Sequence, residues 1–232
     1  MFFHWSALIL IPGVLLMFWA QSRVKGTYRR YAQVPSSLGM SGAEVARTIL
    51  LKMGVTDVKV EQVAGELTDH YDPRAKAVRL SQGIYNSGSL AAAAVAAHEC
   101  GHVLQDKESY QFMNLRATLV PVANLGSQFG PILLMVGIFL SYLGTAISPL
   151  FIYLGIALFV AAIAFHVVTL PVEFDASRRA LKLIDQFGIL QGAENKAAKA
   201  VLDAAAWTYV ATTLYILLQL LQYLIIIFAS RR

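Results

Sequence analysis

The longest uncharged stretch of the chain, residues 117–172, reads ATLVPVANLGSQFGPILLMVGIFLSYLGTAISPLFIYLGIALFVAAIAFHVVTLPV. A helix needs roughly 20 apolar residues to cross the hydrocarbon core of a membrane. This stretch therefore has room for two spans, divided at residues 141–148. Two further runs without Asp, Glu, Lys or Arg, residues 1–22 and 204–230, provide one span each. The sequence predicts an integral membrane protein.

The predicted fold is mainly α, with about four transmembrane helices and a small α+β domain. The spans are expected at residues 3–20, 119–140, 149–170 and 207–228. The expected parts are an N-terminal anchor (1–22), the α+β domain (23–116), two spans (117–172), a helical segment (173–205) and a C-terminal span (206–232). We interpret the first run as a retained anchor because its basic cluster follows the apolar residues, whereas a signal peptide has basic residues before them.

Composition and charge agree with a membrane protein. Charged residues make up 14% of the chain, against about a quarter in soluble domains. The net charge of +5 comes from basic residues that flank the spans, where such residues set orientation. We therefore expect no nucleic-acid partner, and we expect a multi-pass cell-membrane protein with its α+β domain in the cytoplasm. The single cysteine, Cys100, excludes an internal disulfide and is expected to pack inside the protein.

The α+β domain contains recognisable start and stop signals. Ser41 and Glu44 have the spacing of a capping box, and the helix that they open should end at Gly54. Residues 58–61 and 77–81 are predicted strands, and residues 90–105 form an Ala-rich helix too short to span. We expect the strand immediately before that helix to be a sheet edge that pairs with an extended chain.

The Ala-rich helix carries the segment His98-Glu99-Cys100-Gly101-His102. Residues four apart share a helix face, so the two imidazoles can bind one Zn²⁺, with Glu99 as general base for an attacking water. Small residues such as Gly101 allow other elements to pack close to the metal. The alternative is that both histidines simply hydrogen-bond to nearby backbone on an ordinary helix.

Four segments of the chain resemble the neutral zinc metallopeptidases of the bacterial YugP type: residues 71–74, 78–81, 96–105 and 170–177. The similarity extends over nearly the whole chain. It implies a membrane-bound metallopeptidase with a zincin-like domain, one Zn²⁺ per chain and a peptide or protein substrate. It implies no particular natural substrate.

A catalytic zinc needs a third protein ligand. Asp106 and Glu108 lie too close along the same helix, whereas Glu173 returns to the same side after two crossings. Related membrane CAAX prenyl proteases and HtpX-type proteases have a Glu-x-x-Ala-Asp pattern after their spans, which the segment from Glu173 resembles. Ser177 stands in place of the final Asp, so Ser177 or Asp175 is expected to hydrogen-bond to a ligating histidine. The alternative for Glu173 is an interfacial charge at a helix start.

Other polar residues are weaker candidates. His166 lies inside an apolar span and is either an oxyanion donor, an alternative ligand or a neutral histidine bonded within the bundle. Arg178 and Arg179 could reach the substrate, although basic residues beside a membrane usually meet lipid headgroups. His70 and Tyr71 could stabilise a transition state, but a solvated turn is the simpler interpretation.

Together these features predict a zinc-dependent endopeptidase in contact with the lipid bilayer, with Glu99 as its base. An oligomer or a regulatory membrane partner remains open. The alternative of another class is a non-enzymatic membrane protein with a structural metal site. Among enzymes, an intramembrane protease of the site-2 type is disfavoured because its motif normally lies in a span, and hydrolysis of a non-peptide amide or ester would use the same chemistry.

Overall fold

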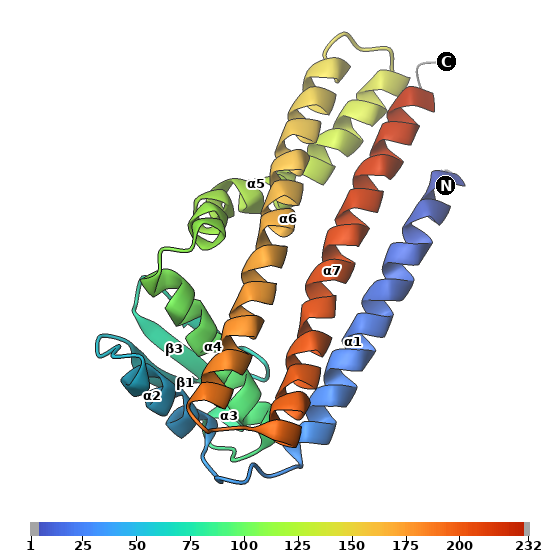
Figure 1. The fold of residues 1–232 in the computed structure, drawn as a ribbon. Coiled ribbons are helices and arrows are strands. Elements are labelled where there is room, and N and C mark those ends of the chain that lie inside the picture. The colour runs from blue at the N-terminus through green and yellow to red at the C-terminus, as the bar shows by residue number, and fades with distance from the viewer. Residues whose placement is uncertain (1–4, 230–232) are drawn as a thin grey trace. The chain divides into compact units, whose positions relative to one another are not determined.

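The computed structural model describes residues 5–229 (Figure 1). Its elements are the 3-10 helix η1 (Trp5–Leu10), the helices α1 (Ile11–Ala32), α2 (Gly42–Lys52), α3 (Gln82–Tyr85), α4 (Leu90–Lys107), α5 (Gln111–Tyr142), α6 (Ser148–Gln186) and α7 (Gly192–Ala229), and the strands β1 (Lys59–Val63), β2 (His70–Asp72) and β3 (Ala77–Ser81). Four helical segments, η1 with α1, α5, α6 and α7, are long and apolar enough to cross a membrane. The predicted mainly α membrane fold with a small sheet is confirmed.

The four long helices extend beyond the predicted spans. α1 continues through the basic cluster to Ala32, and α6 continues through Pro171 to Gln186. Pro171, where the third span is expected to end, therefore lies inside one continuous helix. A proline inside a helix removes one backbone donor, and α6 remains helical on both sides of it. Of the predicted terminal parts, residues 1–4 and 230–232 lie outside the described residues.

The chain divides into two compact units. The described part of the first comprises residues 5–20, 114–171 and 208–229, and the second comprises residues 21–113 and 172–207. α1, α6 and α7 contribute residues to both units.

The described part of the first unit consists of helices and one turn at residues 143–147, and its helices are packed through small residues. A Cβ atom on Gly126 of α5 would lie 2.1 Å from the carbonyl oxygen of Leu158 in α6, so only glycine permits this approach. Close contact through small residues is typical of helices packed in a membrane. α7 joins them through an edge-to-face contact between Phe159 and Tyr223, whose ring centroids lie 5.8 Å apart.

The second unit contains the sheet, with strand order β1-β3-β2. β3 pairs in parallel with β1 and antiparallel with β2. The strand at residues 77–81 is therefore central, and the expectation that it forms an edge is wrong. The edge strand β2 was not predicted: Tyr71 is buried within it rather than in a solvated turn.

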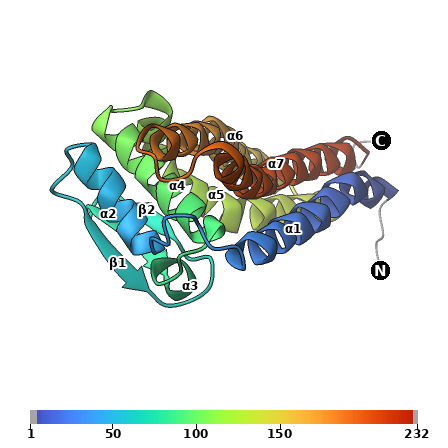
Figure 2. The same cartoon turned by 60° about the horizontal axis from the view of Figure 1, so that its bottom comes forward.

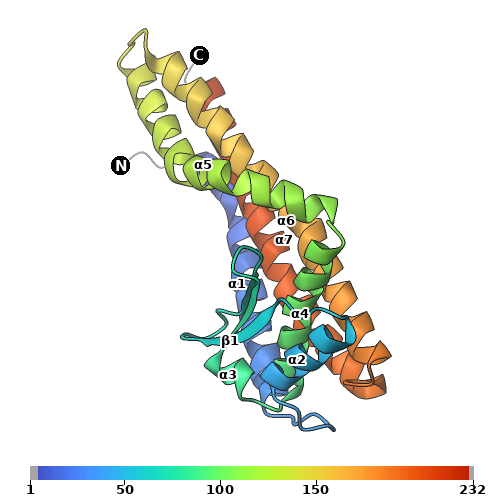
Figure 3. The same ribbon diagram turned by 90° about the vertical axis from the view of Figure 1, so that its left-hand side faces the viewer.

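Both predicted helix starts are confirmed in this unit. In the capping box of α2, the Ser41 amide donates to the Glu44 carboxylate at 2.8 Å, and the Glu44 amide donates to Ser41 Oγ at 3.3 Å. Ser89 caps α4 by accepting from the Ala92 amide. α4 lies against α2 (Figures 2 and 3), and its alanines are fully buried in the core of the unit. The core thus fixes the helix that carries the two histidines.

Candidate metal centre

The two histidines lie near the middle of α4 and face the same side. Their ring centroids are 4.8 Å apart, and the ring planes are nearly perpendicular. His102 is buried and His98 is partly buried. This is the arrangement that the four-residue spacing predicts for a helix.

Glu173 reaches the two histidines from α6, although it lies 75 residues from His98 in the sequence. Its Oε2 atom is 3.3 Å from Nε2 of His98 and 3.8 Å from Nε2 of His102. The carboxylate is almost fully buried, with 3% of the residue exposed. His98, His102 and Glu173 each offer one possible ligand atom, and these three atoms all lie within 4.8 Å of one another.

This donor set fits a zinc ion. Zinc in proteins is held by imidazole nitrogens and carboxylate oxygens, and three such donors leave a fourth position open. The Nδ1 atom of each histidine already faces another side chain: Ser177 Oγ lies 3.2 Å from that of His98, and Gln105 Oε1 lies 3.0 Å from that of His102. Both Nε2 atoms are therefore directed towards Glu173, as ligation by two histidines and one carboxylate requires.

The two residues expected to support a histidine take different roles. Ser177 contacts His98 directly. Asp175 accepts a hydrogen bond of 3.0 Å from Nε2 of Gln105, the residue whose Oε1 faces His102. Asp175 is therefore connected to His102 through Gln105.

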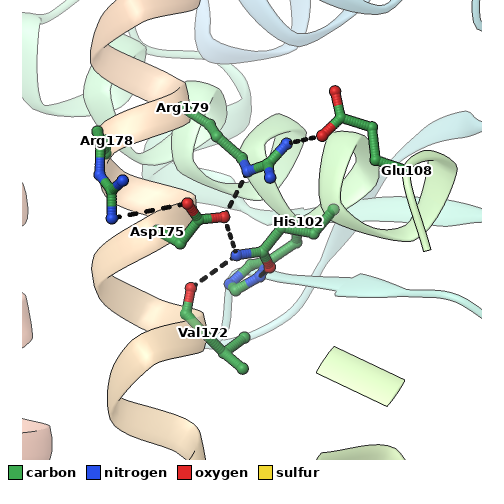
Figure 4. A network of polar contacts seen from close by, with 7 residues as sticks. His102, Glu108, Val172, Asp175, Arg178 and Arg179 are labelled. Carbon is green, nitrogen blue, oxygen red and sulfur yellow. Dashed lines mark hydrogen bonds and ion pairs between the residues drawn. The ribbon is translucent and has the colours of Figure 1, made fainter. Parts of the chain in front are cut away.

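Asp175 also lies at the centre of a charged network (Figure 4). Arg179 forms ion pairs with Asp175 and with Glu108, which follows the end of α4. Arg178 is 3.7 Å from Asp175, but 77% of its side chain is exposed. Sequence reasoning missed the roles of Gln105 and Glu108. The spacing of Asp175 and Arg179, four residues apart on a helix, was the available signal for their ion pair.

Glu99 adjoins this group but is a separate buried acid. Burial is the main cause that raises the pKa of its carboxyl to about 7, and the charge of Glu173 raises the pKa further. The neighbouring His98 and a backbone hydrogen bond from Tyr71 act in the opposite direction. A carboxylate with a pKa near neutral is suited to exchanging a proton with a reacting group.

The side chains of the weaker candidates His70, Tyr71 and His166 lie outside the metal group. The Tyr71 hydroxyl donates to Asp106 at 2.7 Å, and the exposed His70 ring contacts the backbone oxygen of Thr68. His166 belongs to the helical unit, where its ring contacts Phe165. Among the described residues, the candidate metal group contains none of these side chains.

Gly101 allows the backbone of α6 to approach α4. A Cβ atom on Gly101 would lie 2.4 Å from the carbonyl oxygen of Ala176, so the predicted need for a small residue has a physical reason. The neighbouring Cys100 is buried against Ala46, as expected from the sequence.

The close approach of α6 to Gly101 leads to a prediction about the stability of a variant with alanine at this position. Gly101→Ala should lower the free energy of unfolding by about 1–3 kcal/mol, because the added methyl group overpacks a backbone contact. Gly26→Ala is the matched control: this α1 glycine has open space around it, so alanine should raise helix stability by about 0.5–1 kcal/mol. Thermal unfolding in detergent measures both. An unchanged stability of Gly101→Ala would contradict the packing.

Comparison with known proteins identifies the family. The family described as "Putative neutral zinc metallopeptidase" matches residues 6–228. The chain belongs to this family. It is also 44% identical over 223 residues to the "Putative membrane protease YugP" of Bacillus subtilis (strain 168), a match that covers 96% of each protein. No solved structure matches the chain. The resemblance seen in the sequence is thus confirmed, and a zinc peptidase family agrees with the His98, His102 and Glu173 group.

Proposed function

We propose that this protein is a membrane-bound, zinc-dependent endopeptidase with one Zn²⁺ per chain, held by His98, His102 and Glu173. The observation that carries the proposal is the convergence of these three side chains, with Nε2 of each histidine 3.3 or 3.8 Å from the same carboxylate oxygen. A buried carboxylate between two imidazoles is costly unless it is paired or coordinates a metal. Family membership supports zinc as the metal.

When bound, zinc would polarise a substrate carbonyl and lower the pKa of water. Glu99 then acts as the general base: its carboxylate accepts a proton from the attacking water and passes it to the leaving amine. In the metal-free protein, burial and the nearby charge of Glu173 raise the pKa of Glu99 to about 7, so its carboxylate is a stronger base than that of an ordinary glutamate. His98 and His102 keep their Nδ1 atoms turned to Ser177 and Gln105 and so hold the rings in place.

The substrate is proposed to be an extended peptide that pairs with the edge strand β2. β3, the strand expected to pair with the substrate, is central in the sheet, whereas β2 is an edge strand. The support for this pairing is the hydrogen bond between the Tyr71 backbone in β2 and the Glu99 carboxylate. Pairing with a sheet edge supplies backbone hydrogen bonds without demanding one sequence, which suits membrane-associated or unfolded chains.

The catalytic part is proposed to comprise residues 23–116 and 173–205 and to face the cytoplasm. Its support is the charge pattern: the basic residues after the first and third spans lie on one side of the membrane if the chain crosses twice between them, and such residues favour the cytoplasmic side.

Metal dependence tests the proposed function. Detergent-purified protein should cleave a casein-type substrate, lose the cleavage after treatment with a chelator and regain it when zinc is added back. The reason is that no protein group replaces the polarising effect of the metal. Size-exclusion chromatography before and after chelation controls for unfolding. Cleavage that persists in protein shown to contain no metal would contradict the proposal.

A further inference from the structure

Gln105 is a fully buried polar residue one helical turn after His102. Its Nε2 atom donates two hydrogen bonds, one of 2.8 Å to the Val172 carbonyl oxygen and one of 3.0 Å to Asp175 Oδ2. Its Oε1 atom lies 3.0 Å from Nδ1 of His102. The amide is thus bound on all sides, by α6 at one end and by a histidine at the other.

These partners fix the orientation of the amide. A backbone carbonyl and an ionised carboxylate can only accept hydrogen bonds, so they require the NH₂ group of Gln105 to face them. The amide oxygen must then face His102. Because that oxygen can only accept, Nδ1 of His102 must carry the proton, and the lone pair of the neutral ring is left on Nε2. Nε2 is the atom that faces Glu173.

Asp175 is itself held in place by positive charge. Arg179 pairs with it and with Glu108, and the Arg179 guanidinium lies 5.5 Å from the centroid of the Tyr110 ring. Figure 4 shows the ion pairs of Arg179 with Asp175 and with Glu108. The network joins the end of α4 to α6, so the acceptors that orient Gln105 are anchored on two elements.

The contact between His98 and Ser177 does not fix the tautomer of the His98 ring. A hydroxyl can donate or accept, so the 3.2 Å contact between Ser177 Oγ and His98 Nδ1 is compatible with either tautomer. Of the two contacts, the one made by Gln105 selects a protonation state, although both lie at similar distances.

We propose that Gln105 is a positioning residue for His102: anchored by Val172, Asp175 and Arg179, it holds the ring as the Nδ1–H tautomer with Nε2 towards the metal position. The tautomer is a property of the metal-free protein. Its consequence for zinc affinity rests on the proposed function. Partners that orient a ligating histidine typically contribute 10–100-fold to metal affinity or activity.

The experiment is ¹⁵N NMR of histidine-labelled, metal-free full-length protein in detergent, recorded at a pH where the histidine signals no longer change with pH, so that the rings are neutral. In the unmodified protein, His102 should appear as the Nδ1–H tautomer. Gln105→Met keeps the volume of the side chain and removes every hydrogen bond, so His102 should shift towards the Nε2–H tautomer. Gln111→Met, an exposed glutamine at the start of α5, should change nothing.

A competition titration with a chelator then measures zinc affinity, which should fall by about 10–100-fold in Gln105→Met and stay unchanged in Gln111→Met. An Nε2–H tautomer for His102 in the unmodified protein would overturn the proposal, and this result needs no variant to fold. An unaltered tautomer in folded Gln105→Met would also overturn it. If the tautomers behave as expected but the protein neither binds zinc nor cleaves peptides, the positioning role stands and the proposed function fails.

Discussion

Glu99→Gln should lower the rate of peptide-bond cleavage by about 10²–10⁴-fold, the contribution that a general base makes to such a reaction, and should leave zinc bound. Glutamine has the shape of glutamate but cannot accept the proton. Glu99 lies outside the group formed by His98, His102 and Glu173, so its loss removes no proposed ligand. Turnover of a fluorogenic peptide and zinc content of the same purified sample measure the two effects separately.

The matched control for this variant is Glu66→Gln, which changes an exposed carboxylate on the connection between β1 and β2. It should cleave at the normal rate. If Glu99→Gln retained full turnover while binding zinc, another group would have to accept the proton, and the assignment of the base would be wrong.

Glu173→Ala should weaken zinc binding by more than about 100-fold, because losing a direct ligand costs more than the 10–100-fold typical of losing a ligand's hydrogen-bond partner. The remaining pair, His98 and His102, offers two nitrogens where a catalytic zinc site uses three protein ligands. Cleavage should be lost together with the metal and should return in part at high zinc concentration. Competition with a chromogenic chelator gives the affinity.

Asp185→Ala provides the control on the same helix, since Asp185 is an exposed acid of α6 distant from the histidines in sequence. It should bind zinc as the unmodified protein does. Equal zinc affinity in Glu173→Ala and the unmodified protein would show that the carboxylate is not a ligand and would leave its burial beside two imidazoles without a role.

The sequence was sufficient to predict features that depend on local chemistry. Uncharged length locates the spans because charge is costly in lipid, and the spacing of His98 and His102 places both on one face of any helix. The Ser41 and Glu44 capping box depends on residues within one turn. The placement of Glu173 needed a further step, from the number of crossings and the resemblance to related proteases, and it lies beside both histidines.

Features that depend on distant contacts could not be predicted. β2 is three residues long, too short for a periodic pattern, and exists because it pairs with β3. A glutamine near the end of a helix normally suggests an exposed side chain, but Gln105 is buried because α6 supplies acceptors from 67 and 70 residues away. Glu108 also depends on a distant contact. It is too close to the histidines along the chain to be a metal ligand, but it forms an ion pair with Arg179 of α6.

The central claim is that one zinc ion is held by His98, His102 and Glu173 with a coordination position left open. An anomalous-difference map at the zinc edge, from crystals of the zinc-loaded full-length protein, tests it most directly. The account predicts a single strong peak per chain, about 2.0–2.2 Å from Nε2 of both histidines and from the Glu173 carboxylate. A peak away from these atoms, or one bonded to a fourth protein side chain as in a structural zinc site, would contradict it.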